Sequence, residues 1–216
     1  MDISIIGAGN VGRSLATAFV TAGHQVTITS RDLEDANEVA TATGATASTS
    51  NEAAARTASV IVLAVPFSSV PQIATEIGDL VAGKVVVDAT NRMAFGANGP
   101  DIDTSTSNAE EIALMLPSAS VVKAFNTLFA SNQSDPITDG VQLDGFVAAD
   151  DDTARATVLE LVESVGLRPV DVGPLARSRQ LEGLAFLNIA LNIANGGSWQ
   201  SGWKLVGAPV NLSEAA

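Results

Sequence analysis

The chain opens with a glycine-rich turn whose spacing fits the binding of an anion, Gly7-Ala8-Gly9-Asn10-Val11-Gly12. A β-branched run precedes this turn and an apolar-periodic stretch follows it. In that order of strand, turn and helix, a G-x-G-x-x-G pattern predicts a site for the pyrophosphate of a dinucleotide. Gly7 permits the turn, Gly9 lets the backbone approach the pyrophosphate, and Gly12 lets the helix pack on the strand. The free N–H groups and the dipole of the helix would hold the anion.

The residues that end the second predicted strand indicate which dinucleotide binds. An NAD site usually has Asp or Glu at this place, about 20 residues past the glycines, to bind the ribose 2′-hydroxyl. Here Ser30 and Arg31 follow the strand instead. A carboxylate would repel a 2′-phosphate, whereas a hydroxyl and a guanidinium bind it. The sequence therefore favours NADP over NAD, although the nearby Asp32 leaves a dual preference open.

Strands and helices alternate along the first part of the chain. The predicted strands are 3–6, 25–29, 45–47, 60–65, 84–88 and 121–125, and the predicted helices are 11–22, 32–42, 51–57, 68–81 and 107–117. This alternation predicts the α/β class, with a Rossmann-type doubly wound parallel sheet. After a polar loop, 131–140, a small C-terminal α/β extension follows, with strands at 145–149 and 169–172, a helix at 153–165 and a long final helix at 175–195. We place the nucleotide-binding domain at 1–135 and a C-terminal region at 136–216.

Several loops meet at one edge of the predicted sheet, because the carboxyl ends of parallel strands share that edge and ligands bind there. Besides the glycine turn and Ser30-Arg31, these loops contribute Ala64, Val65, Pro66, Thr90, Asn91, Asn126 and Thr127. Pro66 ends its strand and would form a wall beside a nicotinamide ring. Thr90, Asn91 and Asn126 offer hydrogen bonds without charge, as ordinary polar turn residues also do.

The other ionisable residues form no arrangement of nucleophile and base. The chain has no cysteine, and its one histidine, His24, lies in a predicted turn at the opposite edge of the sheet. We interpret His24 as structural, and the run 150–152 of three aspartates as a cap on the next helix rather than a metal site. No general acid–base pair is evident at the ligand edge, and hydride transfer between two bound cofactors needs none.

Composition and charge exclude several classes of partner. The net charge of −13 argues against binding to nucleic acid or to an anionic membrane surface. No apolar run approaches the roughly 18 residues of a membrane helix. No basic segment with a cleavable apolar stretch precedes the first strand, so we expect a cytoplasmic protein. The chain has only 11 lysine and arginine residues. Among them, Arg31 and the pair Arg177 and Arg179 are the candidate anion sites.

These motifs resemble the family of NADPH-dependent reductases of coenzyme F420, a deazaflavin. The resemblance covers nearly the whole chain and rests on the glycine turn, Ser30-Arg31, Val65-Pro66, and the stretches 124–127 and 173–182. The last stretch is the most specific, because ordinary Rossmann enzymes lack it. The resemblance implies hydride exchange between nicotinamide and deazaflavin rings that stack in a hydrophobic cleft.

The resemblance also implies roles for the residues. Ser30 and Arg31 would bind the 2′-phosphate and Gly9 to Val11 the pyrophosphate. The residues that line the hydride-transfer cleft would be Pro66, Asn91 and Asn126. Arg179 would contact a phosphate or carboxylate of coenzyme F420. The region 136–216 would cover the deazaflavin and could form a homodimer through its long helix.

Two departures from the archaeal members keep other activities open. Asn126 replaces a ring-contacting histidine, and Asp35 replaces a basic residue that would add to 2′-phosphate binding. An ordinary flavin (FMN or FAD) or a small imine or keto compound is therefore an alternative acceptor. A third hypothesis is a module that senses NADP(H) without turnover.

The final helix and the residues after it carry two further patterns. Asn188, Asn192 and Asn195 share one helix face, which we interpret as an internal polar contact; a flavin-like ring or a second subunit is the alternative partner. Trp199 and Trp203 also have helical spacing, and we expect them to close a core or an interface rather than to stack on a cofactor.

Overall fold

A computed structural model describes residues 1–96, 99–101 and 104–207. In these residues, the fold is built around an eight-stranded sheet with the strand order β12-β11-β8-β5-β4-β1-β2-β3. The strands are β1 (Asp2–Ile6), β2 (Gln25–Thr29), β3 (Thr46–Ser48), β4 (Val60–Leu63), β5 (Val85–Asp88), β8 (Ser120–Lys123), β11 (Asp144–Ala149) and β12 (Arg168–Asp171). Neighbours pair in parallel except β8 and β11, which are antiparallel. The predicted doubly wound sheet is confirmed.

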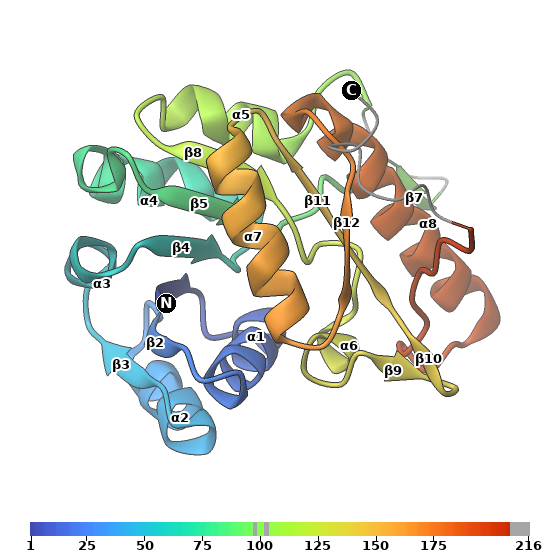
Figure 1. Ribbon diagram of the computed structural model, residues 1–216, viewed down its shortest axis with the longest axis horizontal. Helices are drawn as coiled ribbons and strands as arrows, with labels where there is room; N and C mark the ends of the chain where they lie inside the picture. Colours follow the sequence, from blue (N-terminus) through green and yellow to red (C-terminus); the bar gives the residue numbers. More distant parts are fainter. Residues whose placement is uncertain (97–98, 102–103, 208–216) are drawn as a thin grey trace.

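Helices cover both faces of this sheet (Figure 1). They are α1 (Asn10–Thr21), α2 (Leu33–Thr43), α3 (Asn51–Thr57), α4 (Val70–Ile77), α5 (Asn108–Met115), α6 (Ala130–Ser134), α7 (Asp152–Ser164) and α8 (Ser178–Asn195), with short 3-10 turns η1 (Phe67–Ser69), η2 (Gly78–Val81) and η3 (Leu175–Arg177). Two small hairpins complete the described chain: β6 (Ala94–Gly96) with β7 (Gly99–Asp101), and β9 (Ile137–Thr138) with β10 (Val141–Gln142). The sequence patterns predicted neither hairpin nor α6.

The sheet has a hydrophobic core on each face, because side chains alternate along its buried strands. In β4, Val60 and Val62 join the core beneath α1 and α7, whereas Ile61 and Leu63 join the core beneath α4 and α5. All four residues of β4 are at most 1% exposed. Strands β11 and β12 extend this same sheet, so the C-terminal region continues the architecture of the first domain.

Helix α8 ends at Asn195, as predicted, and the segment after it is not helical. Gly196 ends α8 in the left-handed conformation (φ +58°), the usual role of glycine after a helix. Trp199 then contacts the ring of Phe129 edge-on at 5.2 Å, and Trp203 Nε1 donates to the carbonyl of Leu184 at 3.2 Å. The helical spacing of the two tryptophans was therefore misleading, although each of them packs against the chain itself.

The asparagine row of α8 holds this segment in place. Asn188 Nδ2 donates to the carbonyl of Ser201 at 3.1 Å, and Asn192 Nδ2 donates to Ser201 Oγ at 2.8 Å. The main-chain N–H of Trp199 donates to Asn192 Oδ1 at 3.1 Å. Asn195 is exposed, and among the described residues its side chain bonds only its own helix, at the carbonyl of Leu191. The internal polar contact expected from the sequence is confirmed for two members of the row.

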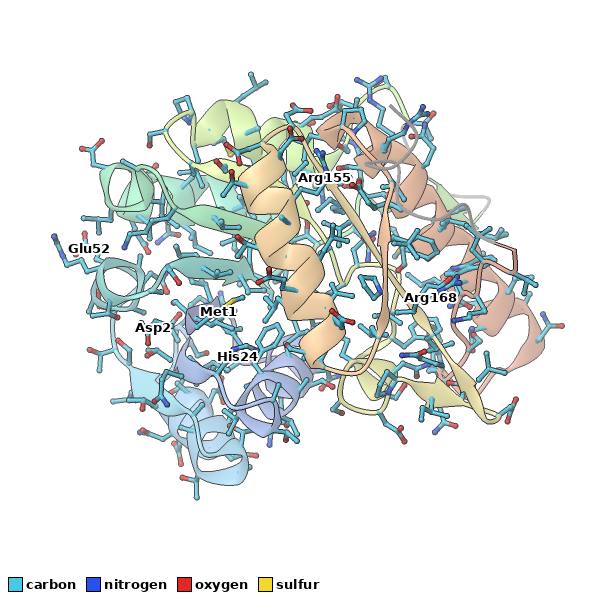
Figure 2. The ribbon with its side chains drawn as sticks, in the orientation of Figure 1. Met1, Asp2, His24, Glu52, Arg155 and Arg168 are labelled. Carbon is cyan, nitrogen blue, oxygen red and sulfur yellow. The ribbon has the colours of Figure 1, made fainter. Side chains whose placement is uncertain are left out.

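A buried carboxylate fastens the end of the described chain to the sheet. Asp144, which opens β11, is fully buried and accepts both the Nε and the Nη2 of Arg168, at 2.7 and 2.6 Å. It also accepts the main-chain N–H of Leu205 at 2.6 Å and lies 3.0 Å from Lys204 Nζ. Arg168 opens β12 and is labelled in Figure 2. Among the described residues, none of the helices combines the length and the apolar character needed to cross a membrane.

Candidate functional site

The glycine turn between β1 and α1 has a shape that side chains would destroy. A Cβ on Gly7 would lie 2.3 Å from the carbonyl oxygen of Ala64, and the residue has a φ of +114°. A Cβ on Gly12 would lie 1.8 Å from the carbonyl oxygen of Gly7. By contrast, a Cβ on Gly9 would meet nothing within 4 Å. Gly7 and Gly12 therefore shape the turn, while Gly9 borders open space.

That open space lies at the N-terminus of α1. Gly9 is the N-cap residue, and among the described residues no side chain accepts a hydrogen bond from the first turn, so the helix is uncapped there. The first turn, which includes Asn10, Val11 and Gly12, also has no acidic residue. Free N–H groups and an uncompensated helix dipole attract an anion. The residues present thus fit a bound pyrophosphate.

A cavity of about 450 Å³ extends from this turn along the edge of the sheet. The predicted residues that line it are Gly7, Ala8, Gly9, Ser30, Arg31, Ala64, Val65 and Pro66. Its volume is in the range of small-ligand sites. Arg31 is exposed and its side chain has no hydrogen-bond or ion-pair partner among the described residues, so its charge is free to meet a ligand. The structure therefore places a free guanidinium and the glycine turn in one cavity.

The far wall of the cavity is polar and comes from α3 and α4. Glu76 accepts from Asn51 Nδ2 at 2.8 Å and from Gln72 Nε2 at 2.9 Å, and Asn51 Oδ1 accepts from Thr29 Oγ1 at 2.6 Å. Glu76 and Asp35 both line the cavity, so two carboxylates share it with Arg31. Sequence reasoning noted Asp35 but not Glu76, which lies more than 40 residues after Arg31 in the chain.

Two of the predicted cleft residues, Asn91 and Asn126, form a separate network at the ends of β5 and β8. Asn91 Nδ2 donates to the carbonyl of Asn126 at 3.0 Å, and Asn126 Nδ2 donates to Asn91 Oδ1 at 2.8 Å. Phe125, just before Asn126, is a buried residue in the left-handed conformation (φ +64°), which costs energy without glycine and is found at functional sites. The structure thus brings Asn91 and Asn126 together, as predicted.

One atom of this network is left without a partner. Asn126 is 4% exposed, and its Oδ1 has no hydrogen-bond donor among the described residues. The bonds to Asn91 fix the orientation of the amide, since Asn91 Oδ1 needs the Nδ2 donor. A buried acceptor without a donor is costly. Asn126 Oδ1 is therefore suited to receive an N–H group from a ligand.

A buried cluster of charges, which the sequence patterns did not reveal, supports this network. Lys123 Nζ lies 2.8 Å from Asp88 Oδ2 and 2.7 Å from Glu182 Oε1, and all three residues are at most 1% exposed. The cluster joins β5, β8 and α8. The sequence did carry a signal, because Asp88 and Lys123 each end a run of valines, where a charge must be buried.

The pKa of Glu182 departs from its ordinary value. Burial away from water, the largest influence, raises this pKa, and the attraction of Lys123 offsets only part of the rise. Glu182 Oε2 is also buried without a hydrogen-bond partner among the described residues, which favours the neutral carboxyl. When Glu182 is protonated, the charges of Lys123 and Asp88 compensate each other.

We predict that this buried carboxyl makes the protein less stable as the pH rises. Because its folded-state pKa is raised, Glu182 contributes its stability below the ordinary pKa and loses it as the pH rises through the raised value. Glu182→Gln has the shape of the neutral acid and does not titrate. The free energy of urea unfolding, measured from about pH 5 to about pH 8, should fall for the wild type relative to this variant. A constant difference between the two proteins would contradict the neutral form of Glu182.

Arg179 lies outside the cavity, in the first turn of α8. Its Nε and Nη2 bind Glu110 Oε2 and Oε1 of α5, at 2.8 and 2.6 Å. The hydrogen bond from Arg179 is the main reason that the pKa of Glu110 is lowered. The Arg179 side chain is 38% exposed, so solvent still reaches it. A contact between Arg179 and a second cofactor stays a prediction.

The residues that we interpreted as structural have structural contacts. His24 lies 3.2 Å from the N-terminal amino group and 2.9 Å from Ser164 Oγ, beside Met1 in Figure 2. Asp151 caps α7 by accepting the N–H of Ala154 at 2.8 Å, which confirms the predicted cap. Asp150 instead accepts the N–H of Leu175 at 2.9 Å.

Comparisons with known proteins agree with this geometry. Residues 2–92 match the family model described as NADP oxidoreductase, coenzyme F420-dependent. The F420-dependent NADP reductase of Methanothermobacter thermautotrophicus is 34% identical over 215 residues, which cover 90% of each chain. Metalloreductase STEAP3 of Rattus norvegicus is 32% identical over 84% of this chain, but the match spans only 36% of that protein.

A solved structure extends the similarity to nearly the whole fold. A protein of Arthrobacter sp. FB24, assigned as an F420-dependent NADP reductase, superposes with a TM-score of 0.85 and 29% identity. The superposition covers 95% of this chain and 99% of that one. Together with the archaeal relative, it identifies the chain as a member of the F420-dependent NADP oxidoreductase family.

Proposed function

We propose that the protein transfers a hydride between NADP(H) and the deazaflavin coenzyme F420. The observation that carries the proposal is the cavity in which the uncapped turn of α1 and the unpaired Arg31 lie together. The named activity of its relatives, NADP reduction dependent on F420, supports the choice of the second cofactor. Family membership makes the protein an NADP-dependent oxidoreductase; the acceptor and its site are the proposed part.

The chain's residues would divide the bound dinucleotide between them. The N–H groups of Gly9, Asn10 and Val11 would hold the pyrophosphate at the start of α1. Ser30 and Arg31 would bind the 2′-phosphate, since no other cation lines the described cavity. When bound, NADPH supplies the hydride, with one proton drawn from solvent for the reduced deazaflavin.

On the nicotinamide side, Pro66 and Thr90 would border the ring, and Asn126 would orient it. The buried Oδ1 of Asn126 would accept an N–H group from the carboxamide or from the second ring. Asn91 holds the amide of Asn126 in that orientation. Neither residue exchanges a proton, so the cleft would act by orienting two rings and excluding water.

We predict that Arg179→Ala weakens the binding of coenzyme F420 and not that of NADPH. The phosphate and carboxylate groups of coenzyme F420 need a cation on a protein with a net charge of −13. Since Arg179 is partly exposed, the KM for F420 should rise about 3- to 10-fold. Steady-state kinetics measure this change. A deazaflavin nucleoside, which lacks the anionic tail, is the control, and its KM should be the same for Arg179→Ala and the wild type. Glu110→Gln, which frees the guanidinium, should lower the KM for F420. Equal effects on F420 and on the nucleoside would contradict the role of Arg179.

An equilibrium titration tests the proposed second cofactor. The fluorescence of F420 would be followed as protein is added, with and without saturating NADP⁺. The proposal predicts binding of F420 that NADP⁺ strengthens, because the dinucleotide completes the cleft. FMN and FAD in the same titration serve as the comparison. Binding of FMN or FAD with no binding of F420 would contradict the proposal.

A further inference from the structure

The buried cluster holds one loop residue through all of its polar groups. The main-chain N–H of Thr90 donates to Asp88 Oδ1 at 2.8 Å, and its carbonyl accepts from Lys123 Nζ at 2.6 Å. The Oγ1 of Thr90 accepts from Asn108 Nδ2 at 2.8 Å, while the N–H of Asn108 donates to Glu182 Oε1 at 2.9 Å. Thr90 is therefore fixed directly to β5, β8 and α5, and Glu182 of α8 holds two of its partners, Asn108 and Lys123.

The next residue carries this constraint into the candidate site. Asn91 follows Thr90 and exchanges two hydrogen bonds with Asn126. Those bonds orient the unpartnered acceptor, Asn126 Oδ1. A displacement of Thr90 would move Asn91 and so change where this acceptor lies. The path from Lys123 to the acceptor is thus made of direct contacts between neighbouring residues.

Stability alone does not explain why such a cluster is present. Buried ion pairs are often no more stabilising than apolar residues of similar volume, because taking the charges out of water is costly. Ionic groups do fix geometry, since each donor needs a particular acceptor. All three hydrogen bonds of Lys123 Nζ are used here, and one of them goes to the main chain of Thr90.

We infer that Lys123 is a positioning residue for the nicotinamide half of the dinucleotide site, acting with Asp88, Glu182 and Asn108 through Thr90. The inference rests on the proposed function for the identity of the ligand. It adds a support for the site that lies behind the residues that touch the ligand. It also predicts that changes in this cluster affect the binding of the nicotinamide half and not of the adenosine half. The reason is that no residue of the cluster lines the cavity that contains Arg31.

Calorimetric titration with two ligands tests this separation. One ligand is NADPH, and the other is 2′-phospho-ADP-ribose, which lacks only the nicotinamide. The double variant Lys123→Met with Asp88→Asn removes the cation without leaving an additional carboxylate unpaired. A small misplacement of reacting groups can lower a rate about 100-fold. We therefore expect the NADPH affinity and kcat/KM of the double variant to fall about 10- to 100-fold. Its affinity for 2′-phospho-ADP-ribose should stay within about twofold of the wild-type value.

A matched control comes from the other end of β5, the strand that carries Asp88. Lys84 precedes β5 and donates to the carbonyls of Ala55 and Arg56, at 2.6 and 2.9 Å. Lys84→Met removes a similar lysine at the opposite edge of the sheet, so it should leave the ratio of the two affinities unchanged. If the double variant does not fold, Asn108→Ala replaces it, since this change keeps every charge and frees only the Thr90 side chain. We expect a loss of about 3- to 10-fold in NADPH affinity from that variant.

The outcomes separate this inference from the proposed reaction. If the folded variant lost affinity for both ligands to the same extent, or for neither, the positioning role of Lys123 would be overturned. A wild-type protein that binds NADPH without turning over F420 would defeat the proposed reaction, yet the ratio of the two affinities would still decide the role of Lys123. Absence of NADPH binding by the wild type would defeat both.

Discussion

Gly9→Ala should abolish tight NADPH binding while leaving the fold nearly as stable as the wild type. The new Cβ would meet no protein atom within 4 Å, so the free protein has room for it. That room is where the pyrophosphate must approach the uncapped N-terminus of α1. We expect a loss of affinity of about 100-fold or more, with a cost in unfolding free energy of about 1 kcal/mol for alanine at an N-cap.

Gly12→Ala is the matched comparison, because its Cβ has no room even in the free protein. That atom would lie 1.8 Å from the carbonyl oxygen of Gly7, so the turn must shift. Overpacking of this kind typically costs about 1–3 kcal/mol, and NADPH binding should be lost as well. Urea unfolding and calorimetric titration of both variants check the pair. If Gly9→Ala bound NADPH normally, the pyrophosphate would not lie at this turn.

Arg31→Ala should weaken NADPH binding about 10- to 100-fold, which is about 1.5–3 kcal/mol, and should change NADH binding little. Arg31 is exposed and has no partner among the described residues, so its loss strands no other charge of the protein. The 2′-phosphate, present only in NADPH, would lose its cation. Dissociation constants of the two dinucleotides for the wild type and the variant measure this difference.

The control for Arg31 is Arg56→Ala, at the end of α3. Arg56 is also exposed, and it does not line the cavity. Its removal makes the same change in net charge, so it reports the general effect of charge on the approach of an anion. The ratio of NADPH to NADH affinity should stay as in the wild type. Equal losses for both dinucleotides in Arg31→Ala would defeat the 2′-phosphate assignment.

The sheet and the loops that line the cavity could be predicted from the sequence because those features depend on local patterns. Runs of β-branched residues define β1, β2 and β4, and glycines at fixed spacing define the turn before α1. Each loop that lines the cavity directly follows such a strand. In a parallel sheet, that order alone places the loops together.

Side chains that meet across distant elements could not be predicted in the same way. Glu182 reaches Lys123 only because α8 packs on β11 and β12 at the C-terminal side of the sheet, and no spacing in the sequence encodes that contact. Glu110 likewise meets Arg179 from another helix. The helical spacing of Trp199 and Trp203 does not correspond to a helix, because Gly196 ends α8 before them, where the sequence predicted the end of the helix.

The most direct measurement is NADPH oxidation by the purified protein with coenzyme F420, FMN and FAD as parallel acceptors. The cavity around Arg31 and the family membership predict turnover with F420, with NADPH preferred over NADH. Turnover with FMN or FAD alone, or tight NADPH binding without oxidation by any acceptor, would contradict the proposed hydride transfer to the deazaflavin.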